Sequence, residues 1–540
     1  MPEQTTRRLP LRGTLRLNRA GDIWHKPAFS AVSAIAVPDG VLLATDRLDL
    51  ALYTSAGALC ALYGHARPYA ARGRALAGVV LGMAAGVGVA LTAASLTGSV
   101  ALLVVVAALL AAVQKTLCDA FRTGPPGSIV LTFVSSTACF VPQRPGEVPF
   151  HVGLVLACGA FAWLICMAPR LVRPYGPERI ATARALEAAA RLLRADTDAA
   201  PRARHTATAL TNAARAELRR APSRRRDGAG VLAALELLLV RAESAAADRP
   251  GSASEAELYD AWARDLRKGR ALPGETTGGG EAPGGRPSGG PTALDRLRPG
   301  SPLLLLGARV LAGCVLAGWA SAAVGIGHPY WAVVTAASVF QANSALSWQR
   351  AVQRVLGNLL GLLLFTALLP VARTGPLAMV VLSVALQFGA EALITRNYWL
   401  ATVCVTPMSL LLGEFAGSHP ARPLVGDRWA DTLVGAAVAL LACALITDRR
   451  RADRVDAAVD RVAEARTTAL ALLDAPHSAH EAGRARDRLA TALVELRETA
   501  DAAAGEWRRR ALPQGHVERA ERDGHHALAA LARRFATAAA

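Results

Sequence analysis

The sequence predicts an all-α membrane protein of about twelve transmembrane helices in two six-helix pseudo-repeats, each followed by a soluble helical hairpin region. Three observations predict it. Hydrophobic residues make up 52% of the 540 residues. Apolar stretches long enough to cross about 30 Å of hydrocarbon fall into two groups. Each group is followed by an Arg-rich region in which apolar residues recur at helical spacing.

The first third of the chain contains one group of apolar stretches. Residues 1–27 form a polar, Arg-rich cytosolic segment without the apolar core of a cleavable signal peptide. The first membrane block, residues 28–171, has apolar stretches near 28–46, 49–64, 74–95, 98–118, 127–142 and 150–170. The first stretch is interrupted by Pro38, Asp39 and Gly40, and the second and fifth are short. Broken or tilted helices that line a cavity would tolerate such interruptions.

The rest of the chain repeats this layout. A cytosolic helical region, residues 172–272, is followed by a Gly- and Pro-rich flexible linker, residues 273–300. The second membrane block, residues 301–447, has apolar stretches near 302–324, 328–345, 352–370, 376–394, 397–413 and 429–447. Residues 448–540 form a C-terminal cytosolic helical region.

The positions of the basic residues predict the orientation in the plasma membrane. With the N-terminus inside, the inside loops of both blocks carry most of the Arg and Lys residues, and the outside loops are nearly bare. We therefore expect a multi-pass protein with both termini in the cytosol.

Two similar segments indicate an internal duplication. Arg74–Gly82 reads RALAGVVLG and Arg354–Gly361 reads RVLGNLLG, so each basic residue precedes a GxxxG pair. Such pairs allow helices to approach closely, which predicts tight helix packing at Gly78, Gly82, Gly357 and Gly361. Because each unit has an even number of spans, the two halves would be related by an axis along the membrane normal.

The composition and the absence of catalytic motifs limit the classes of function that we expect. The net charge is +18, and the basic residues that cause it lie between the apolar spans. There they set the orientation of the protein and favour binding to anionic headgroups rather than to nucleic acid. The sequence lacks GxxxxGK[ST], HExxH, GxSxG and zinc-type spacing, so we expect no enzymatic activity, cofactor or metal site.

A few charged residues within the second block are candidates for transport. Arg350 and Arg354 project from one helix face and would attract organic anions, although anchoring by the positive-inside rule also explains them. Arg309 lies about two turns inside a span, where a charge costs about 3 kcal/mol. Glu391 is the proton-coupling candidate, and structural pairing with Arg396 is its alternative explanation.

Two motifs of the second block resemble a known family. His328–Gln341 reads HPYWAVVTAASVFQ and precedes Arg350 and Arg354, and Asn397–Pro407 reads NYWLATVCVTP. Both look like motifs of the fusaric acid resistance and aromatic acid exporter superfamily. The resemblance implies an inner-membrane permease, in some members a partner in the efflux of hydrophobic or aromatic carboxylic acids. We expect Tyr330 and Trp331 to bind the substrate together with the three arginines. Distant plant relatives in this superfamily are anion channels.

The sequence thus predicts a secondary transporter that exports organic anions, with aromatic carboxylates as the expected class and proton linkage left open. An organic-anion channel and a non-transporting scaffold of the cell envelope are the alternatives. The expected partners are membrane lipid and a small organic anion, with a homo-oligomer left open.

Overall fold

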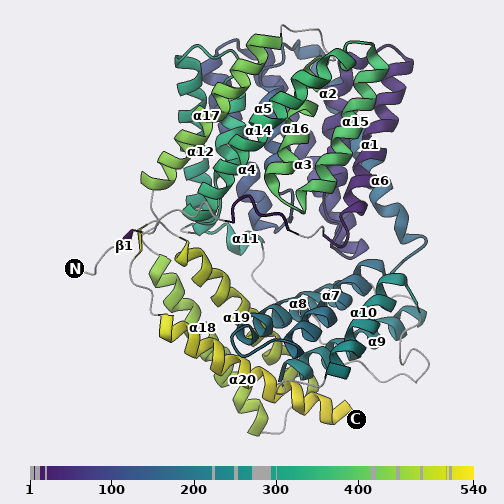
Figure 1. Cartoon of the computed structure of the whole chain (residues 1–540), viewed down its shortest axis with the longest axis vertical. Coiled ribbons are helices and arrows are strands. Elements are labelled where there is room, and N and C mark those ends of the chain that lie inside the picture. Colours follow the sequence, from purple (N-terminus) through teal and green to yellow (C-terminus); the bar gives the residue numbers. More distant parts are fainter. Residues whose placement is uncertain are drawn as a thin grey trace.

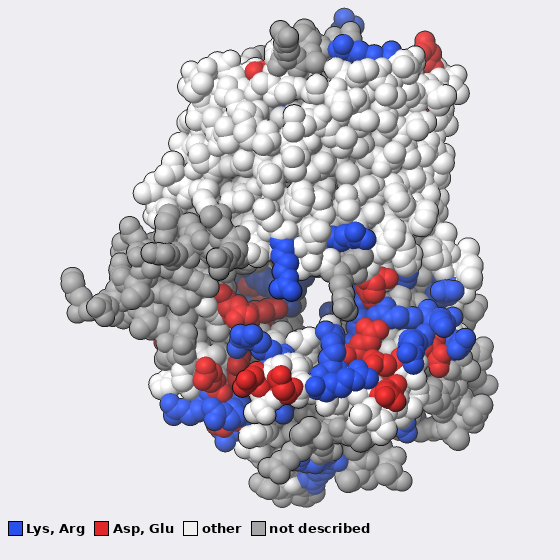
Figure 2. Space-filling view, in the orientation of Figure 1, with Lys and Arg blue, Asp and Glu red and all other residues white. Residues whose placement is uncertain are grey.

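The computed structural model describes the chain except residues 1–4, 7–12, 19–20, 222–225, 248–252, 271–292, 300, 415–420, 446–450, 475–477, 506–507, 510–513 and 540. The described residues form an apolar helical bundle above a group of polar helices (Figure 1). Figure 2 shows the same division: the face of the bundle is largely uncharged, and Lys, Arg, Asp and Glu gather over the polar helices. We call the end of the bundle that faces the polar helices the near end, and the opposite end the far end.

The bundle contains two sets of helices. The first block comprises α1 (His25–Ala44), α2 (Ala51–Ala58), α3 (Tyr69–Leu96), α4 (Val100–Ala120), α5 (Ile129–Ala138) and α6 (Val148–Met167). The second comprises α12 (Pro302–Ala323), α13 (Tyr330–Val339), α14 (Ser344–Ala372), α15 (Pro376–Ile394), α16 (Tyr398–Glu414) and α17 (Ala421–Leu445).

Within the described residues, eight of these helices are long and apolar enough to cross a membrane. The shorter apolar helices span Leu48–Leu62, Ile129–Ala138, Tyr330–Val339 and Tyr398–Gly413. These occupy the second and fifth places of each block. The interruption at Pro38 and Asp39 does not break α1, and Asp39 is buried within the bundle.

Helix packing follows the same scheme in both blocks. In the second block α16 packs against α14 and α15, and α17 packs against α12, α13 and α14. In the first block α5 packs against α3 and α4, and α6 packs against α1, α2 and α3. Between the blocks, α12 packs on α4 and α1 packs on α15, so each block contributes its first and fourth helices to the interface.

The GxxxG pairs of the two blocks differ. A Cβ at Gly357 would lie 2.6 Å from Cβ of Thr402, and a Cβ at Gly361 would lie 2.6 Å from Cβ of Thr406, so α14 packs closely on α16 there. The prediction for Gly78 and Gly82 is wrong: both are exposed, and no described atom lies within 4 Å of an added Cβ. The GxxxG spacing leaves open which face of a helix meets a neighbour, and in α3 the inward face carries Gly86 instead.

The polar regions have more helices than the predicted hairpins. The first has α7 (Gly176–Leu193), α8 (Ala200–Arg220), α9 (Arg226–Ala247) and α10 (Ala253–Lys268). The second has α18 (Arg451–Asp474), α19 (Ala479–Ala504) and α20 (Gln514–Ala539). The hairpin prediction is wrong because two helices alone do not complete either hydrophobic core: α9 and α10 add apolar faces in the first region, and α20 adds one in the second. The predicted linker lies mostly outside the described residues; its described part includes α11 (Ala293–Arg296).

The two polar regions pack on each other through α8 with α19 and α9 with α20. Arg215 is buried at this junction and binds Glu236 at 2.7 Å and Glu243 at 3.0 Å. Burial alone lowers the pKa of Arg215, but the two carboxylates outweigh it and raise the pKa above its usual range. Two-residue strands, β1 (Thr5–Thr6) and β2 (Arg508–Arg509), pair the N-terminal segment with the connection between α19 and α20 of the second region.

Candidate functional site

A column of polar side chains runs through the second block, between α13, α14, α16 and α17. α14 begins at the near end, where the backbone N–H of Ala345 donates to the carbonyl of Gly505 after α19, and α17 begins at the far end. Successive turns of these antiparallel helices therefore place polar residues at successive depths.

The far part of the column contains a cation on an aromatic ring. The guanidinium carbon of Arg428 lies 4.8 Å from the ring centroid of Trp331, and Arg428 is 1% exposed. His328 stacks on the same tryptophan at 4.5 Å and hydrogen-bonds Asp427 at 3.0 Å. Tyr330 lies beside Trp331, at a centroid distance of 5.3 Å.

The middle of the column is a hydrogen-bonded layer. The side-chain amide of Asn358 donates to Thr432 at 2.8 Å, and Thr406 donates to the Asn358 carbonyl oxygen at 2.5 Å. Next to it the hydroxyl of Ser321 donates to the buried carboxylate of Asp431. These bonds tie α14, α16, α17 and α12 together at one depth.

The near part of the column contains two arginines on one tyrosine. Arg354 donates from Nη1 to the hydroxyl of Tyr398 at 3.0 Å, and the guanidinium carbon of Arg350 lies 3.9 Å from the centre of the same ring. Arg354 is 4% exposed, whereas Arg350 is half-buried. The i, i+4 spacing of the two arginines places both on the face of α14 that meets α16.

The buried charges of the column are incompletely satisfied. Nε and Nη1 of Arg428, Nε of Arg354 and Oδ2 of Asp431 have no hydrogen-bond partner among the described residues. No ion pair between Arg428 and a carboxylate lies within 4.0 Å in the described part of the chain. A buried guanidinium without a partner is costly, so these groups favour an anion that supplies acceptors.

An N-terminal segment lies against the near end of the column. The side-chain amides of Gln353 and Asn397, which neighbour Arg354 and Tyr398 in sequence, donate to the carbonyl of Thr14 at 2.8 and 3.1 Å. The segment then reaches Asp22, which accepts hydrogen bonds from Arg184 of α7 at 2.7 Å and from Arg267 of α10 at 2.6 Å.

Asp22 thereby links the membrane bundle to the first polar region. Burial raises the pKa of this carboxyl group, but the hydrogen bonds and charges of the two arginines outweigh that effect and lower the pKa to about 2. The carboxylate therefore stays ionised at neutral pH and holds the N-terminal segment under the bundle.

The remaining predicted site residues lie elsewhere. Arg309 is buried in α12, and its Nη2 donates to the carbonyl oxygen of Cys443 at 3.5 Å. Among the described interactions it contacts neither Arg350 nor Arg354. Glu391 accepts a hydrogen bond from Gln387 at 3.3 Å, and the described residues show no ion pair between it and Arg396.

Sequence reasoning did not assign Arg428, Tyr398 and Asn358 to the site. The predicted span began at residue 429, which placed Arg428 in a loop, whereas α17 begins at Ala421. The signal that was available is the i, i+4 spacing of Arg354 with Asn358 and of Arg428 with Thr432, which repeats a buried polar residue on one helix face.

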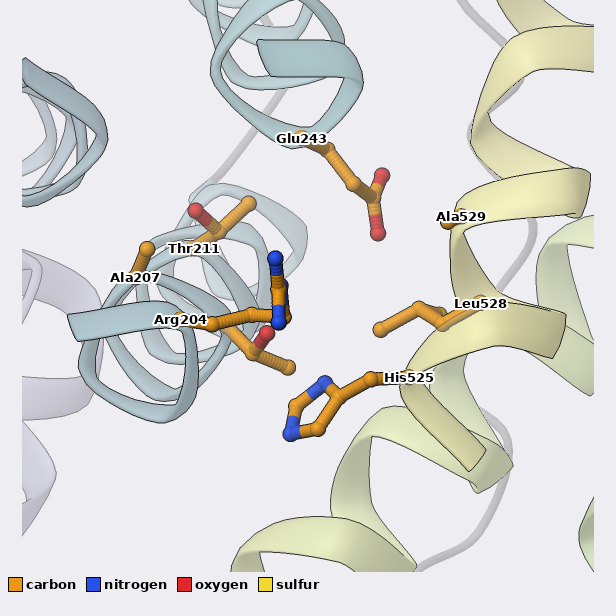
Figure 3. A pocket seen from close by; sticks show the side chains of 8 residues that line it. Arg204, Ala207, Thr211, Glu243, His525, Leu528 and Ala529 are labelled. Carbon is orange, nitrogen blue, oxygen red and sulfur yellow. The ribbon is translucent and has the colours of Figure 1, made fainter. Parts of the chain in front are cut away.

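A pocket between the polar helices is too small for a substrate. Figure 3 shows Arg204 of α8, Glu243 of α9 and His525 of α20 around it, and its volume is about 20 Å³. This is space for about one water molecule. Burial lowers the pKa of His525 to about 3, so the imidazole is neutral and adds no anion-binding charge.

Comparisons with known proteins confirm the resemblance seen in the sequence. The family described as fusaric acid resistance protein-like matches residues 315–442, which include Trp331, Arg354, Tyr398 and Arg428. The chain is 30% identical over 187 residues to the uncharacterized membrane protein YvaC of Bacillus subtilis, covering 34% of this chain and 29% of that protein.

A second relative is similar over a shorter stretch. The chain is 29% identical over 140 residues to the uncharacterized protein slr1298 of Synechocystis, covering 26% of this chain and 18% of that protein. The chain thus spans less than a third of the length of either relative. No solved structure matches the chain. Residues 315–442 of this chain are thus similar to the fusaric acid resistance protein-like family, and the apolar helices together with the membrane-protein relative suggest a multi-pass membrane protein.

Proposed function

We propose that this chain, whose residues 315–442 match the fusaric acid resistance protein-like family, is a permease that exports organic anions, with aromatic carboxylates as its substrate class. The substrate passes along the polar column of the second block. Arg350 and Arg354 receive the anion at the near end, and Arg428 binds it deeper in the bundle, beside Trp331.

The observation that carries this proposal is that the guanidinium of Arg428 is buried without a full set of hydrogen-bond acceptors. Two of its three guanidinium nitrogens, Nε and Nη1, have no hydrogen-bond partner within the part of the chain that the structure describes, although the side chain is 1% exposed. Each of these nitrogens is a charged donor, and a carboxylate supplies acceptors for such donors. The face of Trp331 beside the guanidinium supports an aromatic ring attached to that carboxylate, because offset stacking of rings is favourable.

The repeated packing scheme supports twelve membrane-embedded helices in two pseudo-repeats. Each helix pair in contact within the second block has its counterpart in the first, and the interface uses equivalent helices of both blocks. The shorter second and fifth helices of each block are the ones that leave room for polar residues at depth, as in transporters with discontinuous helices. In the second block these are α13 and α16, which carry Trp331 and Tyr398.

Export is supported by the arrangement of charge along the column. With the near end in the cytosol, as the basic loops predict, Arg350 and Arg354 face the compartment from which the anion leaves. The inside-negative membrane potential favours the exit of an anion. Glu391 of α15 is the carboxyl group proposed for proton linkage.

Flux into proteoliposomes tests the proposal. Purified protein should transport 1-naphthoate faster than acetate and should not transport an aromatic amine. Arg428→Gln should remove most of the 1-naphthoate flux, whereas Arg74→Gln, which changes an exposed near-end arginine, should leave it unchanged. Equal flux in the two variants would refute a role for Arg428. Single-channel currents far above carrier turnover would assign an anion channel instead.

A further inference from the structure

A cavity of about 410 Å³ lies between the near end of α12 and the polar helices α18 and α19. One wall consists of the first turns of α12, with Leu303, Leu305 and Leu306. The opposite wall carries Arg454 of α18 and Glu498 and Thr499 of α19. The volume lies within the range of ordinary ligand sites, and none of the residues of the polar column lines it.

Arg309 stands at the inner end of this cavity. Its side chain is more than nine-tenths buried, its Nε has no hydrogen-bond partner among the described residues, and its one described hydrogen bond, to the carbonyl of Cys443, is long at 3.5 Å. A guanidinium in a membrane helix is costly unless an anion or water compensates its charge. Arg309 therefore requires an acceptor that the described chain does not supply.

The walls of the cavity match the two parts of a phospholipid. The leucines of α12 belong to a membrane-spanning segment, and Leu304, in the same turn, is 40% exposed on its surface. The polar wall comes from helices outside the bundle. Two arginines and one glutamate leave one net positive charge in the lining, which balances the single negative charge of one phosphodiester.

We propose that this cavity binds one anionic phospholipid of the near leaflet, with the phosphate between Arg309 and Arg454 and an acyl chain along the first turns of α12. The lipid would connect α12 to α18 and α19. Attachment of the second polar region to the bundle would then depend on the lipid composition, independently of the transported substrate.

Native mass spectrometry of the purified full chain tests this proposal. In detergent with added phosphatidylglycerol, one lipid should remain bound at collision energies that remove phosphatidylcholine. Arg309→Gln should weaken that site about fivefold or more, because one basic residue near a membrane surface contributes about 1 kcal/mol to anionic lipid binding. Arg309→Lys should retain most of the binding, and the matched control Arg74→Gln should retain all of it.

A second variant separates loss of the site from misfolding. Ala502→Phe fills the cavity without removing a charge, and it should displace the lipid while the bundle stays folded. Unchanged phosphatidylglycerol occupancy in both Arg309→Gln and Ala502→Phe would overturn the proposal. Displacement by glycerol 3-phosphate would show a site for free phosphate, and displacement by 1-naphthoate would place the cavity on the substrate pathway; either result would overturn the assignment to lipid.

Discussion

Replacing Arg354 with alanine removes the cation that Tyr398 positions at the near end of the column. Arg354 donates to the tyrosine hydroxyl from Nη1, which leaves the rest of the fork available for a carboxylate. Arg354→Lys keeps the charge but loses the planar pair of donors. The two substitutions therefore separate the effect of charge from that of geometry.

The magnitude follows from the contacts that each variant loses. A hydrogen bond to a charged group contributes about 1.5–3 kcal/mol, and about 1.4 kcal/mol corresponds to a tenfold change in affinity. Arg354→Ala should therefore raise the KM for 1-naphthoate by about 10-fold to 150-fold. Arg354→Lys should raise it by about fivefold, since charge attraction remains.

The assay is concentration-dependent efflux from loaded proteoliposomes at equal protein content. Tyr398→Phe should give a smaller increase in KM and should not add fully to Arg354→Ala, because the two side chains form one contact. A KM within twofold of the unaltered protein for Arg354→Ala would reduce this arginine to an anchor of membrane topology.

Three further substitutions test the packing, the coupling and the near-end contacts. Gly357→Ala should destabilise the protein by about 1–3 kcal/mol, because the new Cβ meets Thr402, while Gly82→Ala should be neutral in the same thermal unfolding assay. Glu391→Gln should make transport independent of pH if this carboxyl carries the proton; an unchanged pH profile would refute the coupling. The ion pairs of Asp22 stabilise the folded state above the ordinary pKa of a carboxyl, near 4, and this contribution is lost as the pH falls toward 2. Asp22→Asn should therefore lower the melting temperature at pH 7 but not at pH 2, and equal shifts at both pH values would contradict the assigned pKa.

The membrane class could be predicted from the sequence because hydrophobic length is a property of each segment alone. The short second and fifth stretches of the first block were also visible as short apolar runs. Packing faces were harder to predict. Gly78 and Gly82 have the same spacing as Gly357 and Gly361, yet among the described residues only the second pair meets a neighbouring helix.

The part of the site that lies on a single helix was also predictable, because the spacing along one helix is a local property. Arg350 and Arg354 were recognised from their shared helix face, and the structure brings both to Tyr398. Arg428 was not, because hydropathy alone ends a span at a charge, whereas the ring of Trp331 on α13 allows α17 to bury it. That contact joins residues almost a hundred positions apart, and no local pattern shows it.

Photo-crosslinking tests the central claim most directly, because it locates the bound anion without relying on transport. A benzoate that carries a trifluoromethyl diazirine should label α13 and α17 near Trp331 and Arg428, and excess 1-naphthoate should prevent the labelling. Arg428→Gln should lose these adducts while remaining folded. Labelling confined to the polar helices or to lipid-facing residues, or labelling of α17 that Arg428→Gln does not reduce, would contradict the assignment of the substrate to this column.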